Sequence, residues 1–360
     1  MRNPYTRSVH GGTILLKGRE ARKLLVIALA AFLGGYGMLQ SGGSTYEESL
    51  LLQLTASADD DRPAGLRLVM VGDSVTRYQY LSLACFLRYG YWFDPNETNP
   101  NLVDEKSFAS AVNASQDLEW AHFYTETTKL LGPLEKCDCF REIWPEDFEI
   151  DQHVTENRYF FDSDRNNSLV YLQAFGNIQS ALHGRITAED AFRDISSFHY
   201  QHIKSDSLWE YKDWGAALEH YVARMKATHI MMNAGLWAED FHNNTESRDS
   251  IFRVLNSTGM VGIWRTTTYD NKHKLWGGKA DSVMSNLFGD DHVLDVSWTR
   301  QLHRKYYWDI MHFSEPAYRV MNEELLKMVG HQFPSGYQVQ NLGELLDPSI
   351  TRITKTRPTV

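Results

Sequence analysis

The chain has 360 residues, of which 42% are apolar and 12% aromatic, which is enough for a sizeable hydrophobic core and excludes an intrinsically disordered chain. Acidic residues outnumber basic residues by 46 to 36, giving a formal net charge of -10, so binding of nucleic acid through its phosphates is not expected. Three cysteines are too few for a disulfide-built scaffold, and no C-x-x-C pair predicts a structural zinc site.

The first 45 residues predict a membrane-targeting segment. Residues 1–23 are rich in lysine and arginine, and Leu24 to Leu39 then run apolar, with no charged residue before Glu47. The strongly apolar part is shorter than the about 20 residues that a membrane span needs, but the uncharged stretch reaches Tyr46 and is long enough for a thin bilayer. We therefore predict a cytoplasmic basic tail at 1–23 and a signal anchor at 24–45. A cleaved signal peptide is the alternative, although the basic region is long for one and no A-x-A cleavage site ends the apolar run.

N-linked glycosylation is expected if the chain downstream of the anchor is exported. Acceptor sequences of the form N-x-S/T occur at Asn96, Asn113, Asn166, Asn243 and Asn256. These tripeptides support a lumenal domain without establishing one, because they also arise by chance.

A lumenal location would allow the cysteines to oxidise. Cys137 and Cys139 stand two residues apart, which predicts that they are too close to bridge each other easily. Two alternatives follow: Cys85 pairs with one of them and leaves one free thiol, or all three cysteines are buried and unpaired.

The remaining chain predicts a stalk at 46–65, a folded domain at 66–346 and a flexible tail at 347–360. Buried strands are expected at Leu68–Val71, Ser168–Phe175, His229–Asn233 and Gly259–Trp264. Helices are expected at Thr76–Tyr89, at Pro316–Val329 after a cap at Ser314 or Glu315, and along the apolar face of Trp214, Ala217, Leu218, Tyr221, Val222 and Met225. This alternation predicts an α/β fold with a mainly parallel sheet, in which the unpatterned residues 90–165 hold insertions or a lid.

The first predicted strand ends in Gly72-Asp73-Ser74, where the chain leaves the carboxyl edge of the sheet and enters a helix. Open α/β sheets present reactive groups at this edge, so Ser74 is the candidate nucleophile. Gly72 would let the backbone turn tightly, and the amides that open the helix would donate to a developing oxyanion. The plain alternative is a strand-to-helix turn in which Asp73 or Ser74 is only the N-cap.

A serine hydroxyl needs a base to take its proton, and the base needs an acid that holds its tautomer. Near the other end of the chain, Asp309 and His312 stand three residues apart just before the last predicted helix. We expect this pair to reach Ser74, with His312 as the base and Asp309 as its orienting acid. Because a D-x-x-H sequence alone is common and usually explained by local capping, the prediction depends on the joint occurrence of both segments.

The segment Gly72–Cys85, GDSVTRYQYLSLAC, resembles the G-D-S-x-x-R-x-Q-x-x-S-L-x-C block of the trichome-birefringence-like (PC-esterase) family of SGNH (GDSL-like) hydrolases. Asp309–Phe313 and the helix after it are similar to that family's D-x-x-H block. Two weaker similarities lie between these blocks. Asn233–Trp237 resembles an N-x-G-x-W segment, and Trp264–Thr268 resembles an R-T-x-S/T-P region but lacks its proline.

The resemblance implies an SGNH-like three-layer sandwich and gives the serine, histidine and aspartate above the roles of nucleophile, base and orienting acid. It also implies that Gly72, Arg77 and Asn233 contribute oxyanion or substrate contacts. A guanidinium one helical turn after the serine and an amide at a neighbouring strand end would both donate into one site. The alternatives are a solvated helix charge for Arg77 and a strand-end turn residue for Asn233.

Neither a metal nor a cofactor is predicted. His199 and His202 stand at i and i+3, but no third ligand accompanies them. Gly176 is either the superfamily's second-block glycine or a plain turn residue. The family's cysteine-rich amino-terminal portion is missing, so its disulfides are not carried over.

The resemblance and the predicted lumenal location imply transfer of an acyl group, with acetyl expected, through an ester on Ser74. With a sugar hydroxyl as acceptor, the protein would be a glycan O-acetyltransferase in the Golgi or endoplasmic reticulum membrane, with an acetyl donor and a polysaccharide or glycan acceptor as partners. With water as acceptor, it would be a carbohydrate acetyl esterase, either anchored or secreted. A non-catalytic glycan-binding glycoprotein of the same fold is the third alternative.

Overall fold

The computed structural model describes residues 61–93, 127–128, 130–141, 154–174, 181–192, 209–235, 241, 243–270, 278–307, 309 and 311–349. These residues belong to one compact unit, Asp61–Val360, which is distinct from Met1–Asp60. The predicted anchor at 24–45 lies outside the described residues, as do Gly176, His199 and His202. Within the described part, no helix combines the length and the apolar character that a membrane span requires.

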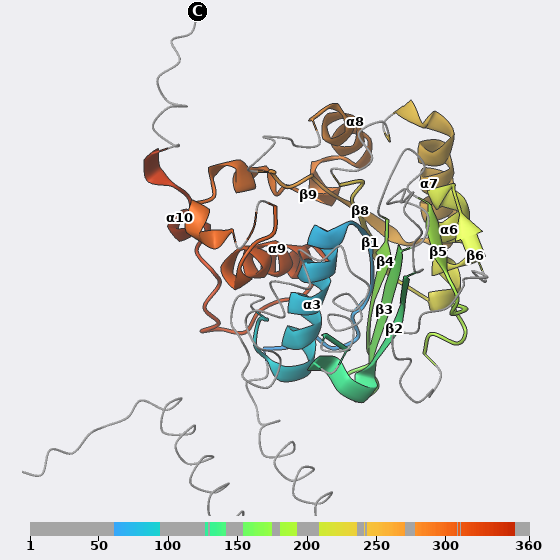
Figure 1. Cartoon of the computed structure of the whole chain (residues 1–360), viewed down its shortest axis with the longest axis horizontal. Coiled ribbons are helices and arrows are strands. Elements are labelled where there is room, and N and C mark those ends of the chain that lie inside the picture. The colour runs from blue at the N-terminus through green and yellow to red at the C-terminus, as the bar shows by residue number, and fades with distance from the viewer. Residues whose placement is uncertain are drawn as a thin grey trace, which may run out of the picture. The chain divides into compact units, whose positions relative to one another are not determined.

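A seven-stranded sheet forms the centre of the described part (Figure 1). Its strands are β1 (Arg67–Gly72), β2 (Glu135–Arg141), β3 (Val154–Asp162), β4 (Asn167–Gln173), β7 (His229–Met232), β8 (Val261–Arg265) and β9 (Val293–Leu294). Across the sheet they follow the order β2-β3-β4-β1-β7-β8-β9. Neighbouring strands pair in parallel along β4-β1-β7-β8-β9, whereas β3 pairs antiparallel with both β4 and β2. The predicted α/β fold with a mainly parallel sheet is therefore confirmed.

Smaller elements surround this sheet. A separate antiparallel pair joins β5 (Leu182–Gly184) and β6 (Trp209–Tyr211). The α-helices are α3 (Ser74–Tyr89), α6 (Trp214–His220), α7 (Thr245–Thr258), α8 (Gly278–Phe288), α9 (Glu315–Met328) and α10 (Leu342–Leu345). Short 3₁₀ helices are η1 (Gly132–Leu134), η2 (Val222–Met225), η4 (Asp290–His292), η5 (Ser297–Gln301) and η6 (Arg304–Tyr306).

Helices cover both faces of the sheet. Successive residues of a strand point to opposite faces, so each strand contributes side chains to two separate cores. In β1, Leu68 and Met70 point into a core shared with α3 and α9. Val69 and Val71 point into a second core, which is shared with α6 and α7. Figure 1 shows these two helix pairs on opposite sides of the strands.

The helix after β1 is a core helix. Asp73 caps α3 by accepting hydrogen bonds from the amides of Val75 and Thr76, and Gly90 ends it in the left-handed conformation at φ 76°. Residues 75–87 are all buried, since α3 packs between the sheet and α9. The helix predicted at Thr76–Tyr89 is therefore confirmed and begins at Ser74.

Two other predicted helices differ in detail. α9 has Ser314 as its N-cap residue, but the Ser314 hydroxyl donates to the carbonyl of Tyr306 instead of capping the helix. The helix predicted along 214–225 is interrupted, because α6 ends at His220 and the 3₁₀ helix η2 follows. Its predicted apolar face is nevertheless buried in the second core.

Residues 90–165, which were predicted to hold insertions or a lid, contain β2 and β3. Charged side chains interrupt both strands and several of them are buried, among them Glu135, Glu156 and Arg158, so no continuous apolar run marks these strands in the sequence. Arg158 of β3 is fully buried and lies 3.1 Å from Glu135 and 2.6 Å from Glu156. Tyr80 and Arg77 of α3 complete this ionic cluster by donating to Glu135 and Glu156, respectively.

The ionic cluster pairs two arginines, Arg77 and Arg158, with two glutamates, Glu135 and Glu156, so its charges compensate one another. Burial raises the pKa of Glu135 to about 7, although Arg158 acts in the opposite direction. Burial alone would lower the pKa of Arg158, but Glu135 and Glu156 outweigh it and raise that pKa. Removal of one member would therefore leave an uncompensated charge in the interior.

We expect Arg158→Met to destabilise the fold by about 3–5 kcal/mol, the typical cost of breaking a buried ion pair from one side. Lys327→Met is the matched control, because its ion pair with Glu324 is exposed and should contribute little. Urea unfolding monitored by tryptophan fluorescence measures both changes. A shift for Arg158→Met no larger than that for Lys327→Met would contradict the role assigned to this cluster.

The cysteine prediction is wrong. The structure joins Cys137 to Cys139, whose Cα atoms lie 5.1 Å apart in β2, and leaves Cys85 as a buried free thiol in α3. The two cysteines are alternate residues of one strand, so their side chains share a face and reach each other. Burial raises the pKa of the Cys85 thiol, which keeps it protonated and unreactive.

Candidate active site

The carboxyl end of β1 lies where the connections of the sheet change direction. β1 pairs with β4 on one side and β7 on the other, and the chain reaches β4 before it crosses to β7. Ligands of open α/β sheets bind outside the carboxyl ends of the strands at such a switch point. Val71, Met232 and Trp264 are in register across β1, β7 and β8, so the polar residues that follow them come together at this edge.

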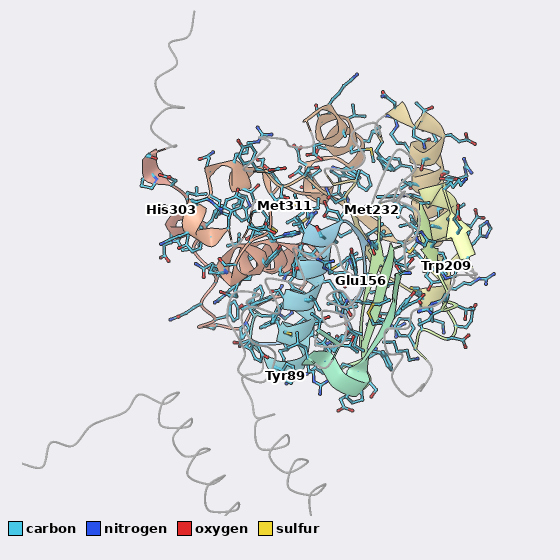
Figure 2. All side chains as sticks on the ribbon, viewed as in Figure 1. Tyr89, Glu156, Trp209, Met232, His303 and Met311 are labelled. Atoms are coloured by element: carbon cyan, nitrogen blue, oxygen red, sulfur yellow. A yellow bond between two sulfur atoms is a disulfide. The ribbon has the colours of Figure 1, made fainter. Side chains whose placement is uncertain are left out.

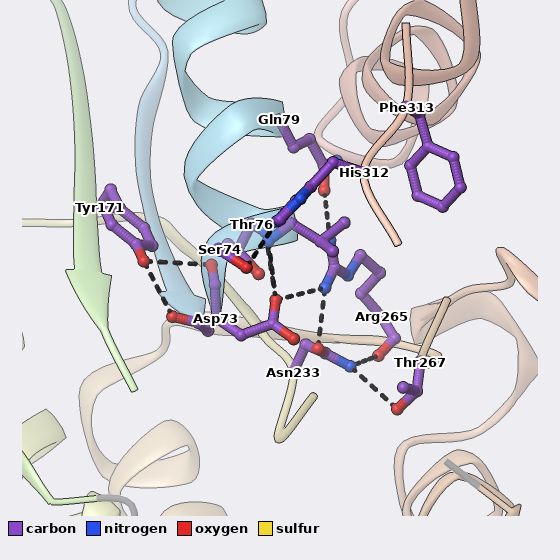
Figure 3. A network of polar contacts seen from close by, with 12 residues as sticks. Asp73, Ser74, Thr76, Gln79, Tyr171, Asn233, Arg265, Thr267, His312 and Phe313 are labelled. Carbon is purple, nitrogen blue, oxygen red and sulfur yellow. Dashed lines mark hydrogen bonds and ion pairs between the residues drawn. The ribbon is translucent and has the colours of Figure 1, made fainter. Parts of the chain in front are cut away.

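Ser74 is the first residue of α3 and is half-buried. Tyr171 of β4 steadies the turn before it by donating to the carbonyls of Gly72 and Asp73 at 3.2 and 3.1 Å. The N-cap alternative is also realised, but by Asp73, which leaves the hydroxyl of Ser74 for another partner (Figure 3).

That partner is His312. Its Nε2 atom lies 2.8 Å from Ser74 Oγ, and its Nδ1 atom lies 2.6 Å from Asp309 Oδ2. Two segments that stand 238 residues apart in the chain thus form one continuous relay, as expected from the sequence. The geometry fits a hydroxyl, a base and an orienting acid in the order that nucleophilic catalysis requires.

Asp309 is held as a carboxylate. Its other oxygen, Oδ1, accepts from the amides of Met311 and His312, both at 2.7 Å. Burial raises the pKa of Asp309, but the hydrogen bonds and charge of His312 outweigh it and bring that pKa below its usual value. An ionised carboxylate only accepts, so Nδ1 of His312 donates to Asp309. In the neutral imidazole, Nε2 is then the nitrogen that accepts from Ser74.

The imidazole of His312 is shielded from water. His312 is 6% exposed, and the ring of Tyr78 packs edge to face against the imidazole, with ring centroids 5.0 Å apart. Burial raises the pKa of Tyr78 to about 12, so the phenol beside the imidazole stays neutral at physiological pH. Figure 2 shows Met311, next to His312, near one end of α3 and Tyr89 at the other end.

Arg77 is not the solvated charge of the alternative interpretation, because it is only 4% exposed. Its Nη1 atom donates to Glu156 at 3.0 Å, and its guanidinium lies over the ring of Tyr78 with 4.6 Å to the centroid. Arg77 therefore contacts Tyr78, the residue whose ring packs on His312. A contact with substrate stays a prediction from the family resemblance.

Asn233 is fully buried, and its side chain is committed to neighbouring strands. Its Nδ2 group donates to the carbonyl of Arg265 at 2.8 Å and to Thr267 Oγ1 at 3.4 Å. Its Oδ1 atom accepts from Arg265 Nη2 at 2.8 Å. The side chain of Asn233 thus joins the end of β7 to the end of β8. Its contact with an oxyanion or substrate stays a prediction from the family resemblance.

Gly72 leaves room for the first turn of α3. A Cβ atom at this position would lie 2.2 Å from Thr76 Oγ1, so any side chain would collide with the first turn of α3. Gly235 has a similar role at the end of β7, where φ is +66° and a Cβ atom would lie 2.3 Å from Asp73 Oδ2. Both glycines let the strand ends approach the Asp73–Ser74 turn.

Within the first turn of α3, the amides of Val75 and Thr76 donate to the side chain of Asp73, and that of Arg77 donates to its carbonyl. The amide of Ser74 is the one in this turn that Asp73 leaves unused. It points from the start of a helix, where the helix dipole favours negative charge. If Ser74 attacks a carbonyl group, the oxyanion that forms would accept a hydrogen bond from this amide.

Arg265 and Gln79 were given no role by the sequence. Arg265 is fully buried, and its Nη1 atom donates to Gln79 Oε1 at 3.0 Å. The Arg265 position belongs to the Trp264–Thr268 similarity, but nothing in the sequence predicts that a charged residue at a strand end turns inward.

Comparison with known proteins adds no role for any of these residues, since no family model, no curated protein and no solved structure matches the chain.

Proposed function

We propose that this protein transfers acetyl groups through an ester on Ser74 and is a glycan O-acetyltransferase of the trichome-birefringence-like family, with an SGNH-like three-layer sandwich. The observation that supports this most is the relay from Ser74 Oγ through His312 to Asp309 at the switch point of the sheet. The family and the acetyl group come from the resemblance of Gly72–Cys85 and Asp309–Phe313 to the family blocks.

The proposed reaction has two half-reactions. Ser74 Oγ attacks the acetyl carbonyl carbon and passes its proton to His312 Nε2, while the oxyanion accepts from the Ser74 amide. The bond to the leaving group then breaks, and His312 returns its proton to that group. In the second half-reaction a sugar hydroxyl attacks the acetyl-serine, gives its proton to His312, and leaves as the acetylated sugar with Ser74 restored.

Hydrolysis of a chromogenic acetyl ester, measured with and without neutral oligosaccharides, tests this proposal. A transferase should form acetylated oligosaccharide, detected by mass spectrometry, and release less free acetate when the sugar is present. Equal acetate release without any acetylated sugar would support the carbohydrate acetyl esterase instead. Absence of turnover together with binding of the sugars would support the non-catalytic glycan-binding alternative.

The location proposed for the chain is a single-pass membrane protein with its folded domain in the lumen of the Golgi or endoplasmic reticulum, the secreted form being the alternative. Asn166, Asn243 and Asn256 are all exposed, as N-linked glycosylation requires. We expect enzymatic removal of N-linked glycans to lower the apparent mass of the full chain expressed in eukaryotic cells. A triple Asn→Gln variant should lose that part of the shift, and an unchanged mass on deglycosylation would contradict the lumenal location.

A further inference from the structure

Arg265, the last residue of β8, is a buried cation beside Ser74 that the proposed reaction does not use. Its guanidinium donates to Gln79 Oε1 at 3.0 Å and to Asn233 Oδ1 at 2.8 Å (Figure 3). The same group lies 3.6 Å from Asp73 Oδ1, which is its ion-pair partner. No part of Arg265 is exposed to solvent.

These contacts gather four elements at one point. Asp73 follows β1, Asn233 follows β7, Arg265 ends β8, and Gln79 lies in α3. A buried charge costs free energy unless it is paired, and an apolar residue of similar volume often serves stability as well or better. The guanidinium is therefore better explained by the geometry that its planar fork imposes than by its contribution to stability.

The contacts of Arg265 reach Asp73, next to Ser74, and through Gln79 they reach the helix that follows His312. Asp73 stands directly before Ser74 and is fixed by its capping bonds, by Arg265 and by the close approach of Gly235. On the other side, the carbonyl of Gln79 accepts from Asn322 at 3.1 Å. Asn322 lies in α9, the helix that follows His312.

We propose that Arg265 is a positioning residue that fixes the Asp73–Ser74 turn against α3, so that Ser74 Oγ stays within hydrogen-bonding distance of His312. This inference rests on the proposed function, because both concern the same serine. Loss of the Arg265 fork is expected to displace the serine without touching the substrate, which lowers kcat and leaves KM nearly unchanged.

The first experiment compares Arg265→Met and Arg265→Lys with wild type in hydrolysis of an acetyl ester, at a temperature where all are folded. We expect kcat to fall by about 100-fold in Arg265→Met, the scale of a misplacement of about 1 Å, with KM changed by less than about threefold. Lysine keeps the cation but not the fork and should recover only part of kcat. Arg185→Met is the matched control, since Arg185 pairs with the buried Asp138 away from the relay and should keep wild-type kcat.

A double variant separates position from stability. Arg265→Met alone leaves Asp73 buried without its cation and should lower the melting temperature. Adding Asp73→Asn removes that unpaired charge while its side-chain oxygen still caps α3, so the melting temperature should rise toward wild type while kcat stays low. Recovery of kcat together with stability would show that Arg265 only neutralises Asp73, and would overturn the positioning role.

A readout without turnover distinguishes this inference from the proposed function. The nitrogen-15 shift of His312 Nε2 reports its hydrogen bond with Ser74, and Ser74→Ala gives the shift of the broken bond. Arg265→Met should move the resonance toward that of Ser74→Ala, and Arg185→Met should not. A wild-type chain inactive on acetyl esters would overturn the proposed function alone, whereas a wild-type His312 spectrum in Arg265→Met, or a rise of KM in place of a fall of kcat, would overturn the positioning role.

Discussion

Replacement of Ser74 by alanine is expected to lower kcat for acetyl-ester hydrolysis by roughly 10⁴- to 10⁶-fold, because the proposed reaction then has no nucleophile. The fold should be almost unaffected. Ser74 is half-buried at the first position of α3, and its hydroxyl contacts His312, whereas the cap comes from Asp73. Stopped assays with purified wild type and Ser74→Ala at equal concentration measure the loss.

The control for this substitution is Ser82→Ala in the same helix. Ser82 is fully buried in α3 and lies two turns beyond Ser74, so its loss should leave kcat unchanged. Retention of more than about one hundredth of wild-type kcat in Ser74→Ala would mean that another residue or an activated water performs the attack.

Asp309→Asn is expected to lower kcat by about 10⁴-fold, because asparagine favours the wrong tautomer of His312. An amide nitrogen opposite Nδ1 would make that atom an acceptor and place the proton on Nε2, which then cannot take one from Ser74. The amides of Met311 and His312 still find an oxygen, so the loop should keep its shape. Asp347→Asn is the control, because the Asp347 side chain accepts from the amide and hydroxyl of Ser349 and takes no part in the relay, so this variant should keep wild-type kcat.

The same substitution has a pH-dependent effect on stability. The pKa of Asp309 is lower in the folded chain than its ordinary value of 3.8, so the carboxylate contributes stability above that value and loses it as the pH falls through the folded pKa. The difference in unfolding free energy between wild type and Asp309→Asn should therefore be larger at about pH 6 than at about pH 3. Urea unfolding at both values measures it, and a difference that grows toward acid would contradict the ionised state assigned to Asp309.

The sequence predicts the parallel part of the sheet and the relay for two separate physical reasons. Strands buried on both faces read as apolar runs, as in Leu68–Val71, and reactive groups follow their carboxyl ends. Ser74 and His312 were found because nucleophilic chemistry demands particular residue types, which are recognisable wherever they stand in the chain. The fold then brings them to 2.8 Å.

The antiparallel edge and the support of the site follow other rules. β2 and β3 bury Glu135, Glu156 and Arg158 against one another, and such pairing between strands leaves no periodic apolar signal. Arg265 and Asn233 turn inward because they satisfy each other, which depends on β7 and β8 lying side by side. The bridge between Cys137 and Cys139 likewise depends on the local path of β2.

The most direct test of the central claim is to expose the full chain to an acetyl ester, quench it with acid within milliseconds, and map the acetyl group by peptide mass spectrometry. We predict one acetyl group on Ser74 in the wild type. Ser74→Ala should carry none, and His312→Ala should acquire it much more slowly. Rapid turnover without acetyl on Ser74, or with the acetyl group on a different side chain, would contradict the claim that Ser74 is the nucleophile activated by His312.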